Sequence, residues 1–298
     1  MRKVLITGAG GFIGRHLIGA CLRKDWRVTG VGKSLSGQFN NHQEVFVLNK
    51  LVQELSESDV RNVDYVFHLA FKTSIPGGIS NPTATSSENV GSSVHLLDLS
   101  AKARVKKFIF ASTASIYGGN PIPWREDMPP DPKEPYSWQK LSCEYACRMW
   151  TKRYGLPTVN LRLFQVFGEN QRKDTVIALF SKAKKDGLPL TLTNIGSDMN
   201  PKSCERDFVY AGDAAEAFIS AALSNKTGAG EVINIGSGRA TRIEDVAKLF
   251  GGEIKWIPRR DYEVEKQQAD VTQTRSLLGW SSRGDVLEWL KGTDLNLI

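Results

Sequence analysis

The sequence predicts an α/β protein: a Rossmann-type, doubly wound parallel sheet with a smaller C-terminal substrate-binding domain. Three observations lead to this prediction. A β-branched run at Lys3–Thr7 passes through a glycine-rich turn into a helical pattern. Apolar runs typical of buried strands then alternate with helical patterns up to about residue 163. Beyond Phe167 this alternation becomes irregular, which indicates a second region.

The expected division is a dinucleotide-binding domain over residues 1–166 and a substrate-binding domain over residues 167–298. Residues 206–236 are expected to return in part to the first domain. A chain of 298 residues is long enough to bury one large core or two closely joined ones. An apolar content of 41% and a charged content of 24% are ordinary for a globular protein.

The first strand, turn and helix form a dinucleotide-binding fingerprint, Gly8-Ala9-Gly10-Gly11-Phe12-Ile13-Gly14. Gly8 permits the tight turn, Gly11 lets backbone N–H groups approach a pyrophosphate, and Gly14 lets the helix lie close to the sheet. The helix amino terminus favours the anion. We therefore expect Gly8, Gly11, Phe12, Ile13 and Gly14 to contact a cofactor.

A strand expected at Lys107–Phe110 and a helix expected from Pro135 to Tyr154 carry the candidate catalytic residues. Thr113 follows the strand at its carboxyl end, where open parallel sheets bind ligands. Tyr136 and Lys140 are four residues apart and share one helix face. A nearby ammonium favours the phenolate, so this pair can perform acid–base chemistry. The alternative is that Tyr136 packs in the core and Lys140 is a solvated charge.

Together these motifs resemble those of the extended short-chain dehydrogenase/reductase family, which contains nucleotide-sugar epimerases, dehydratases and ketoreductases. The resemblance implies that Tyr136 is the acid/base, that Lys140 lowers its pKa and holds the nicotinamide ribose, and that Thr113 orients the substrate oxygen. It also implies that Leu69 and Ala70 line the second half of the cofactor. The matching segments are Thr7–Gly14, Val66–Ala70, Asn89–Gly91, Thr113 with Tyr136 and Lys140, Leu161–Phe164 and Arg206–Tyr210.

Further residues are expected at the substrate because of the same resemblance or their place in the site. Gln165 stands where the family has an asparagine, and Arg206 matches an arginine that binds the substrate diphosphate. The alternative for Arg206 is an ion pair with Asp207. Arg260, in an arginine pair with Arg259, resembles a second diphosphate ligand. The remaining candidates lie in the loop after residue 70 or beside Thr113: Lys72, Thr73, Ser112 and Ser115.

The residues after the second expected strand, Gly32-Lys33-Ser34, indicate the cofactor. Relatives that prefer NAD carry an acid there, which binds the adenosine ribose hydroxyls. Gly32 removes that acid, and Lys33 with Ser34 can bind a 2′-phosphate. We therefore expect NADP, with NAD as the alternative.

The reaction expected from the resemblance is hydride transfer at C4 of a nucleotide-diphosphate sugar. A reductase consumes its cofactor and exchanges it, which suits NADPH, so the Gly32-Lys33-Ser34 pattern favours a 4-ketoreductase of deoxysugar biosynthesis. The alternative is a nucleotide-sugar 4-epimerase. A 4,6-dehydratase ranks lower because Ala114 and Ser115 replace its acid and base. A non-catalytic NADP-binding protein also ranks low, because such proteins usually lose the Tyr/Lys pair.

Composition limits the partners. The net charge of +7 suits anionic cofactors and substrates, and basic residues are not interleaved with aromatics as nucleic-acid binding would require. No apolar run is long enough for a membrane span, and Met1 leads directly into the first strand, so no signal peptide is expected. The four cysteines lack metal-ligand spacing, so no metal is expected. We expect a cytoplasmic homodimer, with Val94, Leu97, Tyr145 and Met149 available for its interface.

Overall fold

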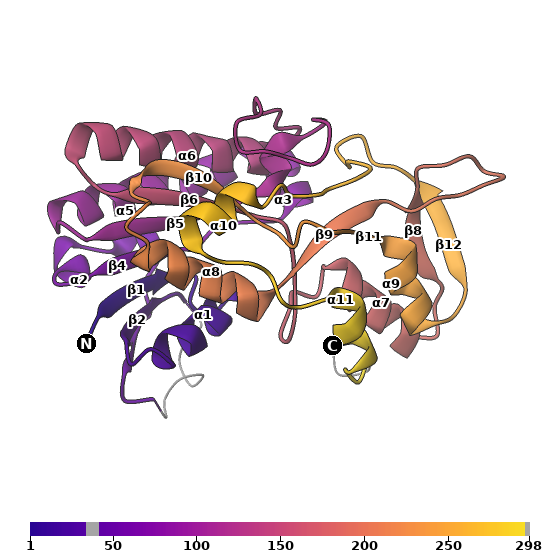
Figure 1. Cartoon of the computed structure of the whole chain (residues 1–298), viewed down its shortest axis with the longest axis horizontal. Helices are drawn as coiled ribbons and strands as arrows, with labels where there is room; N and C mark the ends of the chain where they lie inside the picture. The colour runs from indigo at the N-terminus through magenta and orange to yellow at the C-terminus, as the bar shows by residue number, and fades with distance from the viewer. Residues whose placement is uncertain (34–41, 296–298) are drawn as a thin grey trace.

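A parallel seven-stranded sheet is the centre of the computed structural model, which describes residues 1–33 and 42–295 (Figure 1). Its strand order is β10-β6-β5-β4-β1-β2-β3. This confirms the predicted Rossmann-type α/β fold. The strands are β1 (Lys3–Thr7), β2 (Arg27–Val31), β3 (Val45–Leu48), β4 (Tyr65–His68), β5 (Lys107–Thr113), β6 (Thr158–Leu163) and β10 (Ala229–Ile235).

The strand order reverses at β1, which pairs with β2 on one side and with β4 on the other. The chain first winds outward through β2 and β3, then returns and winds outward through β4, β5 and β6. In such sheets a crevice opens at the carboxyl ends of the strands beside this reversal. The glycine turn after β1 and the residues after β4 and β5 therefore share one edge of the sheet.

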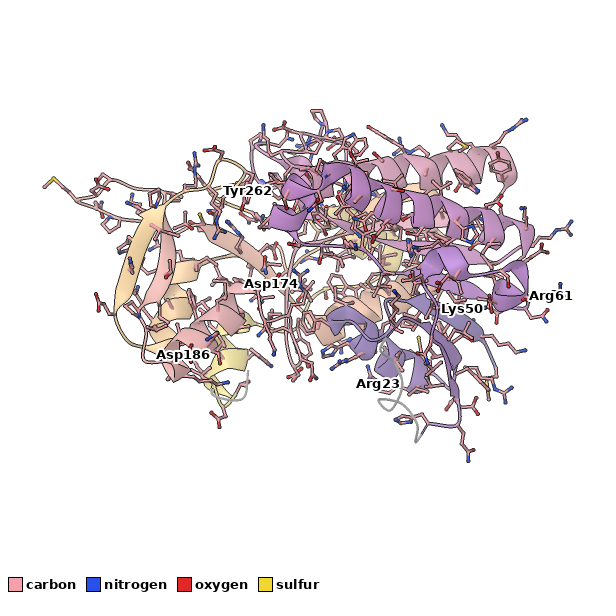
Figure 2. The ribbon with its side chains drawn as sticks, turned by 180° about the vertical axis from the view of Figure 1, so that it is seen from behind. Arg23, Lys50, Arg61, Asp174, Asp186 and Tyr262 are labelled. Atoms are coloured by element: carbon pink, nitrogen blue, oxygen red, sulfur yellow. The ribbon has the colours of Figure 1, made fainter. Side chains whose placement is uncertain are left out.

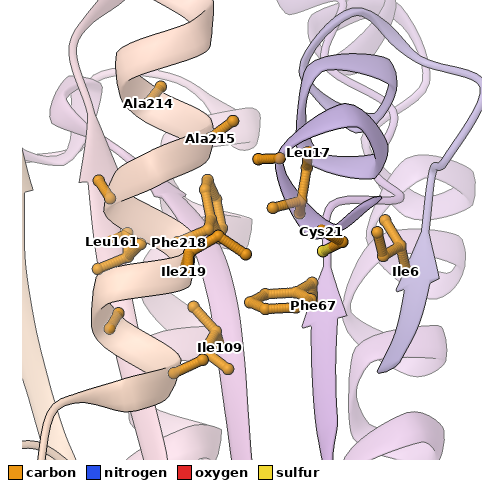
Figure 3. Close-up of a cluster of buried hydrophobic side chains, with 14 of the residues drawn as sticks. Ile6, Leu17, Cys21, Phe67, Ile109, Leu161, Ala214, Ala215, Phe218 and Ile219 are labelled. Carbon is orange, nitrogen blue, oxygen red and sulfur yellow. The ribbon is translucent and has the colours of Figure 1, made fainter. Parts of the chain in front are cut away.

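Helices cover both faces of this sheet because the strands are apolar on both sides. One face carries α1 (Phe12–Leu22) and α8 (Ala211–Leu223). Figure 3 shows Leu17 and Cys21 of α1 meeting Phe218 and Ile219 of α8 over Phe67. The other face carries α2 (Glu57–Val60), α5 (Ser92–Lys102) and α6 (Pro135–Tyr154).

A smaller region continues the chain at the right of Figure 1. Strands β7 (Gln165–Phe167), β9 (Glu205–Tyr210) and β11 (Ala240–Arg242) form one small sheet, and β8 (Leu190–Asn194) pairs with β12 (Ile254–Pro258). The helices α7 (Val176–Lys185), α9 (Ile243–Phe250) and α11 (Val286–Lys291) pack there around a separate apolar cluster. After β9 the chain returns through α8 and β10 to the large sheet, where α10 (Thr272–Leu278) also packs. The domain limits stay a prediction.

Two segments differ from the sequence prediction. The expected loop over residues 71–82 contains the short helix α3 (Ile75–Ser80), which the Ser74 hydroxyl caps by accepting from the Gly77 amide at 3.1 Å. The sequence from about Pro82 to Arg104 also predicts a single helix, and the structure interrupts it: α4 (Pro82–Ser86) and α5 flank a π-helical turn at Ser87–Gly91. A π turn adds one residue to the helical repeat, and composition alone does not indicate it.

One residue expected at a dimer interface is in the core instead. Leu97 is fully buried, because its side of α5 packs into the cluster shared with Cys143 and Cys147 of α6. Tyr145 and Met149 are exposed, as that prediction requires. All four cysteines are buried and unpaired. Among residues 1–33 and 42–295, no helix has the length and apolarity needed to cross a bilayer, and no group of potential ligands is placed to hold a metal.

Candidate active site

The glycine turn has no room for side chains at two of its positions. Gly8 has a φ of +69°, and a Cβ there would lie 2.8 Å from the Ala70 backbone nitrogen. A Cβ on Gly14 would lie 2.3 Å from the Gly8 carbonyl oxygen. Helix α1 begins at Phe12 without an acidic residue in its first turn, so its amino terminus is free to attract an anion. These features fit a dinucleotide pyrophosphate.

Leu69 and Ala70 are held against this turn by Thr7. The buried Thr7 hydroxyl accepts hydrogen bonds from their backbone amides at 3.2 and 3.1 Å. The same hydroxyl is hydrogen-bonded to His68 Nδ1 at 2.7 Å, and His68 Nε2 to Ser93 Oγ at 2.8 Å. Both nitrogens of His68 are therefore satisfied, and burial lowers the pKa of this histidine to about 3. His68 is therefore a neutral core residue.

Gly32 and Lys33 follow β2, as predicted. The Gly32 amide donates to the Leu48 carbonyl at 3.2 Å, and Lys33 is exposed beyond it. Ser34 lies outside the described residues. Nearby, Arg15 Nε donates to the Gly10 carbonyl at 3.0 Å, a support of the glycine turn that the sequence reasoning did not identify.

Helix α6 carries Tyr136 and Lys140, and its bounds are those predicted. Pro135 occupies the first helical position, and Glu134 caps the helix by accepting from the Tyr136 and Ser137 amides. Gly155 ends the helix in the left-handed conformation. Tyr136 and Lys140 face the end of β5, where the Thr113 hydroxyl lies close enough to Tyr136 to lower the pKa of its phenol. The structure therefore brings Thr113, Tyr136 and Lys140 together, although their catalytic roles stay predictions.

Lys140 is buried and its ammonium has a different first partner from the one we expected. Its Nζ donates to the Ala111 carbonyl at 2.6 Å and lies 3.6 Å from the ring centroid of Phe71. The centroid of the Tyr136 ring is 5.9 Å away. Burial lowers the pKa of Lys140 to about 7, against the opposing effects of Cys143 and Glu144.

Tyr136 lies in a mixed electrostatic environment. Burial raises its pKa to about 12, and the nearby charge of Glu134 acts in the same direction. The nearby Thr113 hydroxyl and the charge of Arg172 lower the pKa. Tyr136 is therefore protonated near neutral pH in this structure, and it requires added positive charge to act as a base.

Replacement of Lys140 should stabilise the protein near neutral pH. Because its folded pKa lies below the ordinary value, the unfolded chain binds more protons between pH ~7 and ~10.5, and stability should rise with pH through that window. Lys140→Met should therefore raise the free energy of unfolding by on the order of 1–3 kcal/mol at pH ~7, with a smaller gain near pH ~10. Urea denaturation at both pH values measures this.

The exposed Lys184 of α7 provides the control for that measurement. Lys184→Met should change stability by less than about 0.5 kcal/mol at either pH. A Lys140→Met protein no more stable than the wild type at neutral pH would show that the buried ammonium carries no penalty.

Ser112 is not free to meet a substrate in this structure. It is buried, and its hydroxyl donates to Glu144 Oε1 at 2.5 Å. Glu144 also receives two hydrogen bonds from Arg162, at 2.9 and 2.8 Å. The physical reason is strand alternation: Ser112 points to the opposite side of β5 from Ala111 and Thr113. Ser115 lies beside Thr113, whose hydroxyl donates to Ser115 Oγ at 3.2 Å.

Lys72 and Thr73 lie in the segment that follows β4, where Asn89 and Arg172 hold it. The buried Asn89 side chain accepts from the Lys72 amide at 2.7 Å and donates to the Lys72 carbonyl at 3.1 Å. The Lys72 ammonium pairs with Glu88 at 2.6 Å. Arg172, which follows β7, donates to the Thr73 hydroxyl and forms an ion pair with Asp174. Figure 2 shows Asp174 between the large sheet and the smaller region.

The three remaining substrate candidates lie in the smaller region. Gln165 is half-buried in β7, beside Phe208 of β9. Arg206 pairs with Glu263 at 3.2 Å, so the expected alternative of an ion pair with Asp207 is wrong. The buried Asp207 instead accepts backbone hydrogen bonds from Ser237, Gly238 and Ala269. Arg260 is exposed.

Three charged residues near the catalytic group were not identified from the sequence. Glu144 lies one turn beyond Lys140 on the same helix face, and Arg162 is an arginine inside an apolar strand. A charged residue at either position predicts a buried ion pair, because a buried charge requires a partner of opposite charge. Arg172 reaches the site from a separate segment, and nothing in its local pattern indicated this.

The parallel sheet with its glycine turn is that of a dinucleotide-dependent enzyme, and Tyr136 and Lys140 lie together at the carboxyl edge of this sheet. The sequence profile of the NAD dependent epimerase/dehydratase family matches residues 4–236. The chain belongs to this family, which confirms the predicted relationship to nucleotide-sugar enzymes of the extended short-chain dehydrogenase/reductase type.

Three similar proteins cover nearly the whole chain. An uncharacterized UDP-glucose epimerase, YtcB of Bacillus subtilis, is 31% identical over 93% of this chain and 92% of its own length. A UDP-glucose 4-epimerase of Mycolicibacterium smegmatis is 28% identical over 98% and 97%. The structure of a UDP-glucuronic acid 4-epimerase from Bacillus cereus with UDP-glucuronic acid and NAD superposes with a TM-score of 0.90, at 26% identity over 99% and 98%.

Proposed function

We propose that this protein is an NAD(P)-dependent 4-epimerase of a UDP-sugar. The observation that carries the proposal is the convergence of Thr113, Tyr136 and Lys140 at the carboxyl end of β5, on the sheet edge that also carries the glycine turn. The chain is similar over nearly its whole length to UDP-sugar 4-epimerases. The Gly32-Lys33-Ser34 pattern by itself favours a 4-ketoreductase. The comparisons support the epimerase alternative better, because the similar proteins of Mycolicibacterium smegmatis and Bacillus cereus are both named as 4-epimerases of UDP-sugars.

The residues of the site suit a reversible oxidation at C4. When bound, a nicotinamide cofactor supplies hydride acceptance and return. Tyr136 takes the proton of the sugar 4-hydroxyl and gives it back, and Thr113 holds that oxygen. A pKa near 12 keeps Tyr136 in the form that donates a proton to a 4-keto oxygen. In the oxidising direction, the positive charges of Lys140 and Arg172 favour the phenolate.

The test is a stoichiometry measurement. Purified protein is mixed with UDP-glucose, UDP-glucuronic acid or UDP-N-acetylglucosamine, and the products are separated while absorbance at the reduced-nicotinamide band is followed. Interconversion of two C4 epimers without net absorbance change supports the epimerase. Consumption of one reduced cofactor per molecule of a UDP-4-keto-6-deoxysugar would instead identify a 4-ketoreductase, the candidate that Gly32 and Lys33 favour.

The cofactor preference is a separate proposal: NADP, with NAD as the alternative. It is supported by Gly32, which leaves no carboxylate at the end of β2, and by the exposed charge of Lys33. Gly32→Asp should weaken NADP binding and strengthen NAD binding, because the carboxylate repels a 2′-phosphate and accepts from ribose hydroxyls. The expected loss for NADP is on the order of 2–3 kcal/mol, tens- to hundred-fold in affinity.

Equilibrium titration with each reduced cofactor, followed by nicotinamide fluorescence, measures that preference. Lys33→Gln is the companion variant: it should weaken NADP without strengthening NAD. Equal binding of both cofactors by the wild type, with no change in either variant, would remove the proposed role of this segment.

We also propose a homodimer in a reducing compartment such as the cytoplasm. One face of α6 exposes three large side chains at spacings of seven and four residues, namely Trp138, Tyr145 and Met149. A second copy that packs against this helix would cover them. The buried, unpaired cysteines are typical of reducing compartments. Sedimentation of the wild type and Tyr145→Glu tests the dimer, which the introduced charge should dissociate.

A further inference from the structure

Helix α6 and the end of strand β5 meet residue by residue. On α6, the side chains of Tyr136, Lys140 and Glu144 follow one another at a spacing of four and so share one face. Each meets β5. Tyr136 lies near the Thr113 hydroxyl, Lys140 Nζ donates to the Ala111 carbonyl at 2.6 Å, and Glu144 accepts from the Ser112 hydroxyl at 2.5 Å. The first two contacts involve the proposed catalytic residues, whereas Glu144 has no role in the reaction described above.

Glu144 joins three elements through one carboxylate. Its side chain is 4% exposed, and that of its partner Arg162 on β6 is 3% exposed. Arg162 donates to both carboxylate oxygens, through Nε and one terminal nitrogen, while Ser112 donates to one of them. Arg162 is held in turn over the ring of Tyr117, 4.6 Å from its centroid. These contacts hold in place the end of β5, which carries the Ala111 carbonyl and the Thr113 hydroxyl.

We propose that Glu144 is a positioning residue of the reaction: anchored by Arg162, its carboxylate holds the end of β5 against α6 and supports the charge of the Lys140 ammonium. The proposal rests on the proposed function, because it assigns Glu144 to the same Tyr/Lys site. It differs from a purely structural ion pair, since an ion pair that only stabilised the fold would leave the protonation of Lys140 unchanged.

The groups that face Lys140 support the electrostatic part of this role. From β4 comes His68, which is neutral because burial lowers its pKa to about 3. From α6 come Tyr136, Cys143 and Glu144, and burial raises the pKa of Cys143 to about 11, so that thiol is neutral near pH 7. Rings of Phe71 and Phe110 complete the surroundings. Cys143 and Glu144 both oppose the effect of burial on the pKa of Lys140, and because the Cys143 thiol is neutral, the negative charge beside the ammonium near pH 7 comes from the Glu144 carboxylate.

Three variants separate the two parts of the proposal. Glu144→Gln keeps the shape and removes the charge. Glu144→Asp keeps the charge, but its shorter side chain cannot reach Ser112 and Arg162 together. Ser112→Ala removes only the hydrogen bond to the end of β5. Each is measured for kcat and KM across pH, relative to folded protein, and for the titration of Lys140 by NMR of protein labelled at the lysine ε-carbon. Lys140→Met identifies the signal.

Glu144→Gln should move the titration of Lys140 to lower pH by about one pH unit, which corresponds to a tenfold change in its protonation constant. The alkaline limb of the kcat profile should move by the same amount. Glu144→Asp and Ser112→Ala should leave that limb in place and lower kcat several-fold with little change in KM. If Glu144→Gln does not fold, the two remaining variants decide the positioning part alone.

Two results would overturn the proposal. One is a folded Glu144→Gln protein with the titration of Lys140 and the pH profile of the wild type. The other is wild-type kcat in both Glu144→Asp and Ser112→Ala. Failure of the proposed function is distinguishable, because it shows as a wild type that interconverts no UDP-sugars. The titration of Lys140 is measured without turnover and still tests the charge of Glu144 in that case.

Discussion

Tyr136→Phe is expected to fold, to bind cofactor and to lose at least ~10² in turnover. The substitution removes one oxygen from a side chain that α6 holds between the Glu134 cap and the buried Lys140. The phenylalanine ring can keep the contact with Phe71, whose centroid lies 5.9 Å from that of Tyr136. Only the proton-carrying hydroxyl beside Thr113 is lost, so the change should appear in kcat.

The measurement compares initial rates of C4 interconversion with the melting temperature and cofactor affinity of the same preparations. Tyr145→Phe is the matched control, because Tyr145 lies on the same helix with 52% of its surface exposed. It should retain wild-type turnover. A Tyr136→Phe enzyme with nearly full activity would exclude the acid–base role and direct attention to Ser115 and Thr113.

Gly14→Ala is expected to abolish cofactor binding or to destabilise the protein by roughly 2–4 kcal/mol. The added methyl group would lie 2.3 Å from the Gly8 carbonyl oxygen and 2.7 Å from that of Ala9. Both atoms belong to backbone, so neither can move aside as a flexible side chain would. Helix α1 must therefore shift from the turn, which separates the backbone amides from the place where a pyrophosphate would lie.

Gly19→Ala in the same helix is the control for this effect. A Cβ on Gly19 would come no nearer than 3.6 Å to another group, the end of the Arg23 side chain. Replacement of a helical glycine there should stabilise the protein by about 0.5–1 kcal/mol. Thermal unfolding with and without cofactor measures both variants, and a Gly14→Ala protein with wild-type affinity would contradict the close packing of the turn.

Elements bounded by local signals were predictable from the sequence. Pro135 and Gly155 gave both ends of α6, because proline suits a first helical turn and glycine adopts the left-handed conformation that ends a helix. The turn at Gly8 and the site at the end of β5 followed from the order of strand, turn and helix. In each case a few neighbouring residues determine the backbone conformation, so the local sequence is sufficient to predict it.

Features that depend on distant partners were not predictable. The hydrogen bond of Ser112 to Glu144 joins residues 32 positions apart, and Thr73 receives Arg172 from 99 positions away. The Lys140 ammonium was expected to act on Tyr136. Its Nζ instead donates a hydrogen bond to the backbone carbonyl of Ala111 at 2.6 Å. The residues around Tyr136 also do not distinguish a reductase from an epimerase, because both reactions use the same proton carrier.

The strand order has a consequence for how the chain folds. β6 pairs with β10 along its whole length, but the two strands are separated in sequence by the elements of the smaller region. During synthesis, the apolar faces of β1, β4 and β5 therefore stay uncovered until α8 has been made. One edge of β6 likewise stays unpaired until β10 has been made. Such late, long-range pairing is slow. We expect a ribosome-bound chain truncated before residue 211 to be cut readily by protease, and one that includes residue 235 to be resistant.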